Sequence, residues 1–499
     1  MKKIIILCTC ILLLCACDNR KKVLEKNDSG VVYEIFVGSF NDSDGDGIGD
    51  LKGVSAKLDY IRAMGVEYIW LMPINISPSY HKYDVVDYYQ IDPKYGSMAD
   101  FEELISKAKE KNIKIIMDLV VNHTSNDHQW FKTAIKQQMA SDCIDDLCNY
   151  YNFKNVSTPH YTKINNQLFY ESQFVDTMPD LNLANKKVVD EIYNVAKFYL
   201  EKGVSGFRLD AVLSYFDNDD QKNIQFIKEF NDYCHQIKDD VYLVAEAWTS
   251  SMRVKNYYHS GINSLFDFDL SDAQGLLAKS VNSGNTRGLS NYLNQYYQEL
   301  KKINPSALNA VYLSNHDQGR SSGYFNSLDK KKVAAATYLW LPGMPYIYYG
   351  EEVELKGSGK DENKRTYMPW GENHDAKNPS GVDYDQSKQV VVSVKDALKD
   401  NNSLLNYMTE LINIRNKYPF IKQASYQALN LQDGLLGYIL SDGKNEIVIV
   451  HNLTAENKIE RLTDEYQLLE TMSKNNSFKQ NVLNIDGYSS VILETKHDK

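Results

Sequence analysis

Short apolar runs rich in β-branched and aromatic residues recur from residue 31 to residue 349, with amphipathic stretches between them. Eight runs stand out: Val31–Val37, Glu67–Met72, Lys114–Val121, Val204–Asp210, Val241–Ala247, Ser264–Asp269, Asn309–Ser314 and Pro345–Tyr349. Runs that are apolar at nearly every position are typical of strands in a parallel sheet covered by helices. Eight of them predict an α/β fold, and specifically a closed (β/α)8 TIM barrel rather than an open sheet.

Three amphipathic stretches carry the helical period, with apolar residues recurring every three or four positions. They are Leu51–Met64, Met98–Lys111 and Lys187–Lys202, and the last two come directly ahead of the third and fourth predicted strands. Helices in these places are the connections that a parallel barrel requires.

The pattern changes in two places. Residues 123–175 are polar and rich in aromatic residues and show no clear helix–strand unit, so they are expected to form a subdomain inserted after the third strand. The barrel then comprises residues 31–122 and 176–420. Residues 421–499 show short alternating strands and are expected to form a C-terminal antiparallel β-sandwich. Its strands are Leu435–Leu440, Glu446–His451, Gln467–Glu470 and Ser489–Glu494.

Residues 1–17 form a targeting segment, with a basic start and an apolar run too short to span a bilayer comfortably. The segment ends in Leu14-Cys15-Ala16-Cys17, which resembles a bacterial lipobox and implies a lipid on Cys17. An ordinary secretory signal and an uncleaved anchor are the alternatives. Residues 18–30 are polar and are expected to be a tether. We therefore expect an exported cell-envelope lipoprotein, membrane-anchored in the periplasm or at the cell surface.

The net charge and the cysteines limit which partners and which covalent links are expected. The net charge of −11 over 499 residues argues against nucleic acid, because phosphate binding needs a basic footprint. Cys143 and Cys148 are close enough in sequence to close a small loop, and an exported protein can keep a disulfide, although two free thiols remain an alternative. Cys234 lies in an amphipathic stretch and is expected to be buried.

Charged residues gather where the predicted strands end. Asp118 and His123 follow the third run, Arg208 and Asp210 the fourth, Glu246 the fifth, and His316 and Asp317 the seventh. Active sites of barrels lie at the carboxyl ends of the strands, so these side chains are expected to meet. Arg208 and Asp210 point to the same side of their strand, and the guanidinium favours an ionised carboxylate. A nucleophile requires that state, although a structural ion pair or strand caps would also explain these residues.

At these positions the chain resembles the α-amylase family of glycoside hydrolases. Four stretches look like its signature regions: DLVVNHTS from Asp118, GFRLDAV from Gly206, VAEAW from Val244 and LSNHD from Leu313. Further similar stretches are GDGIGDLKG from Gly45, YDVVDY from Tyr83, MPDLN from Met178, PGMPYIYYGEE from Pro342 and ENKRTYMPW from Glu362. Within the family, the chain resembles bacterial cell-envelope lipoproteins of the neopullulanase-like MPDLN subgroup.

The resemblance implies roles for individual residues. Asp210 would be the nucleophile, Glu246 the general acid and later base, and Asp317 the residue that binds ring hydroxyls and distorts the sugar. Burial would raise the pKa of Glu246 so that it can hold a proton near neutral pH. A retaining mechanism needs the two reacting carboxyls about 5–5.5 Å apart. The implied substrate-binding residues are Tyr83, His123, Arg208, His316 and Arg365.

An acidic loop follows the first predicted strand. Carboxylates at Asp42, Asp44, Asp46 and Asp50 resemble the start of a calcium loop, but Gly53 stands where an EF-hand has its bidentate glutamate. The family resemblance implies a structural Ca²⁺ or Mg²⁺ held by these four side chains and the backbone carbonyl of Ile48. A solvated acidic turn without metal is the alternative.

Specificity is where the chain departs from the family. Many α-amylases have lysine and histidine shortly after the nucleophile, and this chain has Leu213 and Ser214 there. Lys82 also replaces the glycine often found before Tyr83. The main hypothesis is a retaining endo-type hydrolase of α-1,4-glucosidic bonds in starch or maltooligosaccharides. Exo-acting α-glucosidase, oligo-1,6-glucosidase and transglycosylase activities stay open, as do two other classes: a non-catalytic glycan-binding barrel and a barrel hydrolase with a catalytic metal.

Overall fold

The computed structural model describes residues 27–371, 375–383 and 389–495. The predicted (β/α)8 barrel is confirmed, because eight parallel strands close in the order β1-β13-β12-β11-β10-β9-β5-β2. These strands are β1 (Val32–Ile35), β2 (Tyr68–Leu71), β5 (Lys114–Leu119), β9 (Gly206–Leu209), β10 (Tyr242–Ala245), β11 (Ser264–Phe266), β12 (Leu308–Tyr312) and β13 (Met344–Tyr348).

The barrel has two apolar layers because side chains alternate along each strand. Inside the barrel, a cluster centred on Trp70, Phe266 and Tyr346 fills the space between the strands. The outward side chains, such as Ile69 and Phe207, join the larger core beneath the helices. The barrel is therefore a packed core, and a site can form only at its ends.

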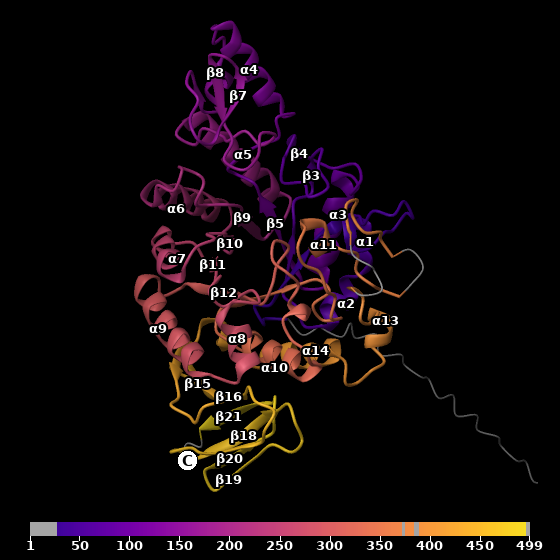
Figure 1. Ribbon diagram of the computed structural model, residues 1–499, viewed down its shortest axis with the longest axis vertical. Coiled ribbons are helices and arrows are strands. Elements are labelled where there is room, and N and C mark those ends of the chain that lie inside the picture. The colour runs from indigo at the N-terminus through magenta and orange to yellow at the C-terminus, as the bar shows by residue number, and fades with distance from the viewer. Residues whose placement is uncertain (1–26, 372–374, 384–388, 496–499) are drawn as a thin grey trace, which may run out of the picture.

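Helices surround the barrel (Figure 1). The predicted helix at Leu51–Met64 is two helices, because Lys57 leaves helical geometry (φ −102°, ψ 6°). The other two predicted helices are present, with α3 capped by Ser97 and α5 by Asn185. The helices are α1 (Leu51–Ala56), α2 (Leu58–Ala63), α3 (Met98–Glu110), α5 (Lys186–Glu201), α6 (Asp220–Ile237), α7 (Ser251–Tyr257), α8 (Leu276–Ser283), α9 (Arg287–Ile303), α10 (Leu328–Leu339), α11 (Asp361–Lys364), α13 (Val394–Ala397) and α14 (Leu404–Lys417).

The stretch between β5 and α5 contains more regular structure than the sequence pattern indicated. Helix α4 (Gln129–Ala140) was not predicted; the His128 side chain caps it by accepting from the Trp130 N–H, and Phe131 is buried on its inner face. A sheet follows in the order β6 (Phe153–Lys154), β8 (Leu168–Glu171) and β7 (Tyr161–Asn165). Cys143 and Cys148 form a disulfide. Figure 1 shows this segment at one end of the molecule.

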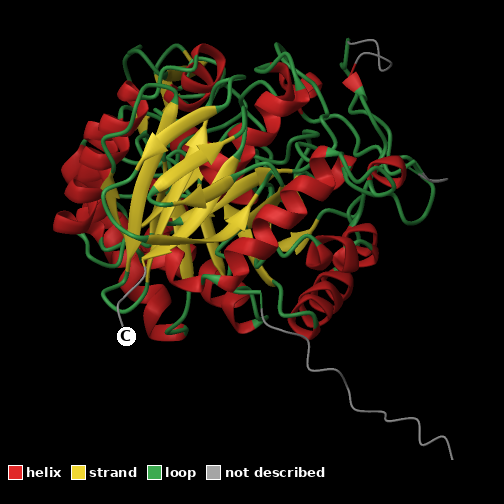
Figure 2. Cartoon of the chain, turned by 90° about the horizontal axis from the view of Figure 1, so that it is seen from below, coloured by secondary structure: helices red, strands yellow, loops and turns green. Residues whose placement is uncertain are grey.

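The C-terminal strands lie at the opposite end (Figure 1), and Figure 2 views the molecule from that side. Five antiparallel strands pair in the order β14 (Ser425–Ala428), β15 (Leu435–Ser441), β16 (Glu446–Asn452), β21 (Ser490–Thr495) and β18 (Tyr466–Thr471). A second sheet has the order β17 (Lys458–Arg461), β20 (Val482–Ile485) and β19 (Ser477–Lys479). The antiparallel C-terminal sheets expected from the sequence are therefore present. Tyr426 of β14 stacks on Tyr297 of α9, which joins the first sheet to the barrel helices.

The N-terminal predictions concern residues that are largely outside the described part. The signal segment and Cys17 lie outside the described residues. Residues 27–30, expected to end a tether, instead pack on the barrel: Ser29 is buried, the Gly30 N–H donates to Glu67 (2.8 Å) and Asp28 pairs with Lys422 (2.5 Å). Within the described ranges, no helix combines the length and apolar character needed to cross a bilayer.

Candidate active site

The predicted site residues meet in one cleft at the carboxyl end of the barrel. The cleft has a volume of about 410 Å³. Six of the eight predicted catalytic and substrate-binding residues line it, and the other two, Arg208 and His316, lie directly behind them and bond to them. The six are Tyr83, His123, Asp210, Glu246, Asp317 and Arg365.

Arg208 connects the carboxylates of this cleft. Its Nη1 bonds Asp210 Oδ1 at 2.6 Å and Asp118 Oδ1 at 2.9 Å, and its Nη2 bonds Glu246 Oε2 at 2.9 Å. The guanidinium is 1% exposed and lies over the ring of Trp70, with 5.3 Å to the centroid. The Arg208–Asp210 ion pair therefore exists, but Arg208 also bonds two further carboxylates, and Asp210 and Glu246 line the cleft, which a strand cap alone would not require.

A sharp backbone turn follows Asp210. Ala211 has a φ of 48°, a left-handed conformation that is unfavourable for a residue with a Cβ atom. Its N–H donates to Glu246 Oε2 at 3.0 Å, and the Val212 N–H donates to the Glu246 carbonyl, also at 3.0 Å. The turn thus fixes the Glu246 side chain relative to Asp210 by direct hydrogen bonds between β9 and β10.

Burial sets the protonation of Glu246. It raises the pKa of this carboxyl to about 7; Arg208 opposes the shift and Asp210 adds to it. A carboxylic acid with this pKa is still largely protonated in a weakly acidic solution, which is the state a general acid needs.

Asp317 has the opposite environment. Burial alone would raise its pKa, but His316 and Arg365 outweigh it and hold the pKa well below its usual range. Arg365 Nη2 lies 2.9 Å from Asp317 Oδ1, and His316 Nε2 lies 3.0 Å from Asp317 Oδ2. Asp317 is therefore a carboxylate that can accept hydrogen bonds from sugar hydroxyls.

Glu34 of β1 supports His316 from inside the barrel, a role the sequence pattern did not predict. His316 Nδ1 lies 2.5 Å from Glu34 Oε1, and both side chains are buried. Burial lowers the pKa of His316, but Asp317 and Glu34 outweigh it and raise the pKa to about 9. The sequence did contain an indication that Glu34 has a partner, because a glutamate inside an apolar strand requires one.

Tyr83 and His123 also line the cleft. The Tyr83 hydroxyl is 3.0 Å from Asp118 Oδ2 and 2.7 Å from His316 Nε2, and its ring stacks on that of His316. His123 is buried, and burial lowers its pKa, which favours the neutral ring. Neither of its nitrogens bonds a side chain within the described ranges, which leaves hydrogen-bonding capacity for a ligand.

Aromatic residues that the sequence did not single out extend the cleft. Trp248 is 52% exposed and stacks on Phe268 with centroids 5.0 Å apart and an angle of 15° between the rings. Phe174, also exposed, lies 5.2 Å from the His123 ring. Trp248 stands two residues after Glu246 in the sequence, but a pattern of residue types does not show which aromatic rings remain exposed.

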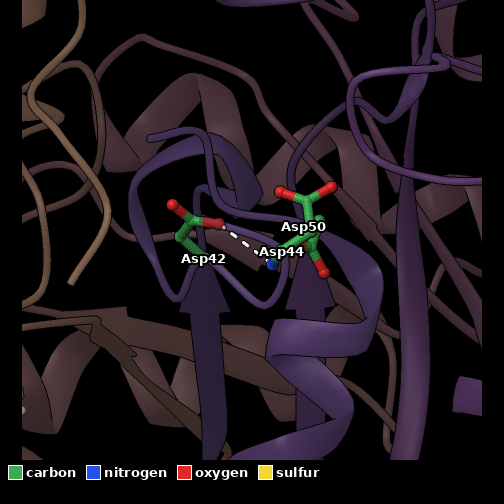
Figure 3. A group of neighbouring side chains, drawn as sticks. All are labelled: Asp42, Asp44 and Asp50. Carbon is green, nitrogen blue, oxygen red and sulfur yellow. Dashed lines mark hydrogen bonds between the residues drawn. The ribbon is translucent and has the colours of Figure 1, made fainter. Parts of the chain in front are cut away.

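The acidic loop after β1 brings three of its carboxylates together (Figure 3). One oxygen each from Asp42, Asp44 and Asp50 lie within 4.8 Å of one another. Hard oxygen donors of this kind suit Ca²⁺ or Mg²⁺. Asp46 is not part of this group; it is exposed, and its carboxylate accepts from the Ile48 N–H at 2.7 Å. The roles of Asp46 and of the Ile48 carbonyl stay predictions.

Known proteins resemble the chain over nearly all of its length. The family model described as "Alpha amylase, catalytic domain" matches residues 34–424. "Alpha-amylase 3" of Dictyoglomus thermophilum is 39% identical over 93% of this chain and 93% of its own. The structure of Eubacterium rectale Amy13B superposes with a TM-score of 0.90 and 36% identity, covering 94% of this chain and 96% of that one.

Relatives with other printed activities are more distant. A "Glucan 1,6-alpha-glucosidase" of Streptococcus pneumoniae is 28% identical over 91% of this chain and 95% of its own. The printed activities of the relatives therefore differ. The match to the family model, in contrast, extends over the whole barrel. On this match and on the extent of the relatives' similarity, the chain belongs to the α-amylase family of glycoside hydrolases, and it is an enzyme.

Proposed function

We propose that the protein is a retaining, endo-acting hydrolase of α-1,4-glucosidic bonds in starch or maltooligosaccharides. The observation that carries this proposal is the Arg208 guanidinium, which bonds the Asp210 and Glu246 carboxyls through its two terminal nitrogens. This arrangement keeps two carboxyls beside each other at the cleft, as the double-displacement mechanism needs.

In the first step, an Asp210 oxygen attacks the anomeric carbon while Glu246 donates its proton to the glycosidic oxygen. The bond between the anomeric carbon and the glycosidic oxygen breaks, the shortened glucan leaves with a hydroxyl, and a glycosyl ester forms on Asp210. In the second step, Glu246 takes a proton from water, which attacks the same carbon and releases Asp210 as a carboxylate. Two inversions give net retention of the α configuration.

The remaining cleft residues would bind the sugar at the point of cleavage. Asp317 offers a carboxylate to ring hydroxyls, and Arg365 (2.9 Å) and His316 (3.0 Å) hold that carboxylate in place. His123 also lines the cleft, and its ring nitrogens have no side-chain partner within the described residues. Tyr83 would stack on the sugar.

Recognition on the leaving-group side would rest on aromatic and apolar contacts. Leu213 and Ser214, which replace the family's lysine and histidine, are absent from the described cleft lining. Trp248, exposed beside Glu246, supplies a flat surface on which a further glucose unit can stack. A surface beyond the acid favours binding of a longer chain across the cleft, and therefore internal cleavage. The same surface would also bind a sugar acceptor, which favours transglycosylation as the second candidate.

We also propose that the protein binds a structural metal ion. Asp42, Asp44 and Asp50 would hold Ca²⁺ or Mg²⁺ in the loop between β1 and α1, where Asp50 also caps α1 by accepting from the Gly53 N–H at 2.7 Å. A cation there would neutralise the three carboxylates and hold the loop against the helix.

For localisation, we propose export and a lipid anchor on Cys17, in the periplasm or at the cell surface, on the basis of the lipobox-like sequence. Metabolic labelling with a radioactive fatty acid tests this. Label on the wild-type chain and none on Cys17→Ser supports the anchor, and equal label on both contradicts it.

The product profile tests the specificity. Starch, pullulan, isomaltose and maltotriose are incubated with the enzyme and the products are separated over time. Early release of mixed maltooligosaccharides from starch supports endo-acting α-1,4 cleavage, whereas glucose alone, or activity on isomaltose alone, contradicts it. Products longer than the substrate indicate transfer. Asp210→Asn should abolish all release, with Asp240→Asn, a surface carboxylate, as the matched control.

A further inference from the structure

Lys82 occupies a backbone position that does not suit it. It belongs to the loop of residues 77–84 between β3 (Asn75–Ile76) and β4 (Asp87–Ile91), and its φ is 67°. Glycine adopts this left-handed conformation freely, whereas a residue with a Cβ atom does so at a cost. Lys82 is also 3% exposed, although lysine is almost never buried without a partner. A buried lysine at a left-handed backbone position indicates that the contacts of its side chain have a structural or functional role.

The Lys82 ammonium bonds one carboxylate and two backbone carbonyls around its own loop. Nζ lies 2.7 Å from Asp92 Oδ2 and donates to the carbonyls of Ser77 (3.3 Å) and Ser79 (3.2 Å). Asp92 is 5% exposed and directly follows β4, and Tyr95 lies beneath the ammonium with 5.4 Å to its centroid. The ion pair therefore ties the start of the loop to the end of β4 inside the protein.

The loop carries two residues that line the cleft. Tyr83 follows Lys82 directly, and its hydroxyl contacts Asp118 and His316. His81 precedes Lys82, and its Nδ1 accepts from the Tyr83 N–H at 3.2 Å. The backbone at Lys82 thus determines where both side chains lie, because both are attached to the segment that the ammonium holds.

We propose that Lys82 is a positioning residue for the glycosidase reaction. Its buried ammonium, bonded to Asp92 and to the carbonyls of Ser77 and Ser79, holds residues 77–84 so that Tyr83 contacts Asp118 and His316. The role concerns the sugar at the point of cleavage, so it does not depend on whether the bond is α-1,4 or α-1,6, or on endo or exo action.

A second set of contacts keeps the loop folded when the ammonium is removed. Asp84 Oδ1 accepts from the Ser77 hydroxyl at 2.6 Å and also from the Ser79 hydroxyl. Loss of Lys82 therefore displaces Tyr83 without unfolding the loop. A small displacement of a substrate-binding group lowers transition-state binding more than substrate binding, so kcat falls more than KM rises.

The test compares Lys82→Met, which removes the charge, and Lys82→Gly, which also removes the backbone cost, with the wild type. Lys331→Met is the matched control, since Lys331 pairs with Glu354 at 2.6 Å, outside the cleft. With 4-nitrophenyl α-maltotrioside, kcat per folded molecule should fall about tenfold to a hundredfold in both Lys82 variants, with KM changed less. The control should keep its kcat. Thermal unfolding gives the folded fraction in each case.

Chemical rescue separates positioning from general stability. Ammonium or propylammonium chloride added to Lys82→Gly should restore part of kcat, while the same ionic strength of sodium chloride should not. Wild-type kcat in Lys82→Gly, or a loss fully explained by less folded protein, would overturn the proposal. Equal recovery with sodium chloride would overturn it too, because the ammonium would then have no specific place. A chain without glycosidase activity in the wild type would instead refute the enzymatic reaction itself.

Discussion

The Ala211 backbone N–H donates to Glu246 Oε2 at 3.0 Å, and Arg208 Nη2 lies 2.9 Å from the same oxygen. Both partners are donors, so Oε2 is an acceptor whatever the protonation of Glu246. The acidic proton of Glu246 must therefore sit on Oε1. The turn at Ala211 thus orients Glu246, the proposed acid, beside Asp210, the proposed nucleophile, and this gives a reason for its unfavourable φ of 48°.

Glu246 should set the alkaline limb of the pH profile. Its pKa is raised to about 7, and the acid must be protonated to assist the leaving group, so kcat should fall as the pH rises through about 7. Glu246→Gln should lose most activity on maltooligosaccharides together with this limb. Glu246→Ala should retain far more activity on a substrate with a good leaving group, such as an α-glucosyl fluoride, than on maltotriose. An unchanged alkaline limb in Glu246→Gln would contradict the assignment.

Arg208→Lys should damage both stability and catalysis. Lysine keeps the charge, but a single ammonium cannot bond Asp118, Asp210 and Glu246 in the geometry of the guanidinium. Breaking a buried charge network costs about 3–5 kcal/mol of unfolding free energy, and kcat should fall about 100-fold or more. Denaturant unfolding and steady-state kinetics measure the two effects.

Arg415→Lys is the control for that variant. Arg415 is equally buried, but it donates to the carbonyls of Leu339 and Leu341 away from the cleft. It should lose stability while kcat per folded molecule stays near that of the wild type. A similar loss of kcat in both variants would mean that the effect of Arg208 is one of general folding.

The acidic loop should make stability dependent on Ca²⁺ or Mg²⁺. A ligand at about 100 times its dissociation constant adds about 2.7 kcal/mol to the unfolding free energy. Calcium should therefore raise Tm in the wild type and a chelator should lower it, with activity lost only as the fold is lost. Asp42→Asn should lose most of this response, and surface Asp240→Asn should keep it. Activity that disappears at once with a chelator and returns at once with metal would indicate a catalytic metal instead.

His451 should make the protein sensitive to acid. Its ring is fully buried between Tyr438 and Ser490, and burial lowers its pKa to about 3, below the value of about 6.5 for an exposed histidine. The unfolded chain therefore binds a proton that the folded one does not. This contribution to stability is present above about pH 6.5 and is lost as the pH falls toward 3, by at most about 1.4 kcal/mol per pH unit.

Urea unfolding across this pH range measures that slope. His451→Gln should flatten it, and the same substitution at exposed His259 is the matched control. A slope that is unchanged in His451→Gln would show that other groups govern acid unfolding.

The barrel could be predicted because its strands are apolar at nearly every position, and the cleft could be predicted because charged residues end those strands. Individual contacts between side chains could not be predicted. Nothing in the sequence pairs Glu34 with His316, which lie 282 positions apart, or indicates that Lys82 reaches Asp92 from a left-handed backbone. The α4 start was missed because His128 is an unusual helix cap, and the break at Lys57 carries no proline or glycine at that residue.

The geometry of the acidic loop could not be predicted from the sequence either. Spacing identified Asp42, Asp44, Asp46 and Asp50 equally, but the fold of the loop brings only three of the carboxylates within 4.8 Å. Which side chains converge depends on backbone turns that short-range spacing does not determine.

Identification of the residue that becomes covalently bonded tests the central claim most directly. A 5-fluoro-α-glucosyl fluoride slows breakdown of the glycosyl ester, so the labelled protein can be digested and its peptides measured by mass spectrometry. The account predicts one added glycosyl group, located on Asp210 in the peptide that contains residues 204–212. A label on Asp118 or Glu246, or turnover of the fluoride without any covalent adduct, would contradict it.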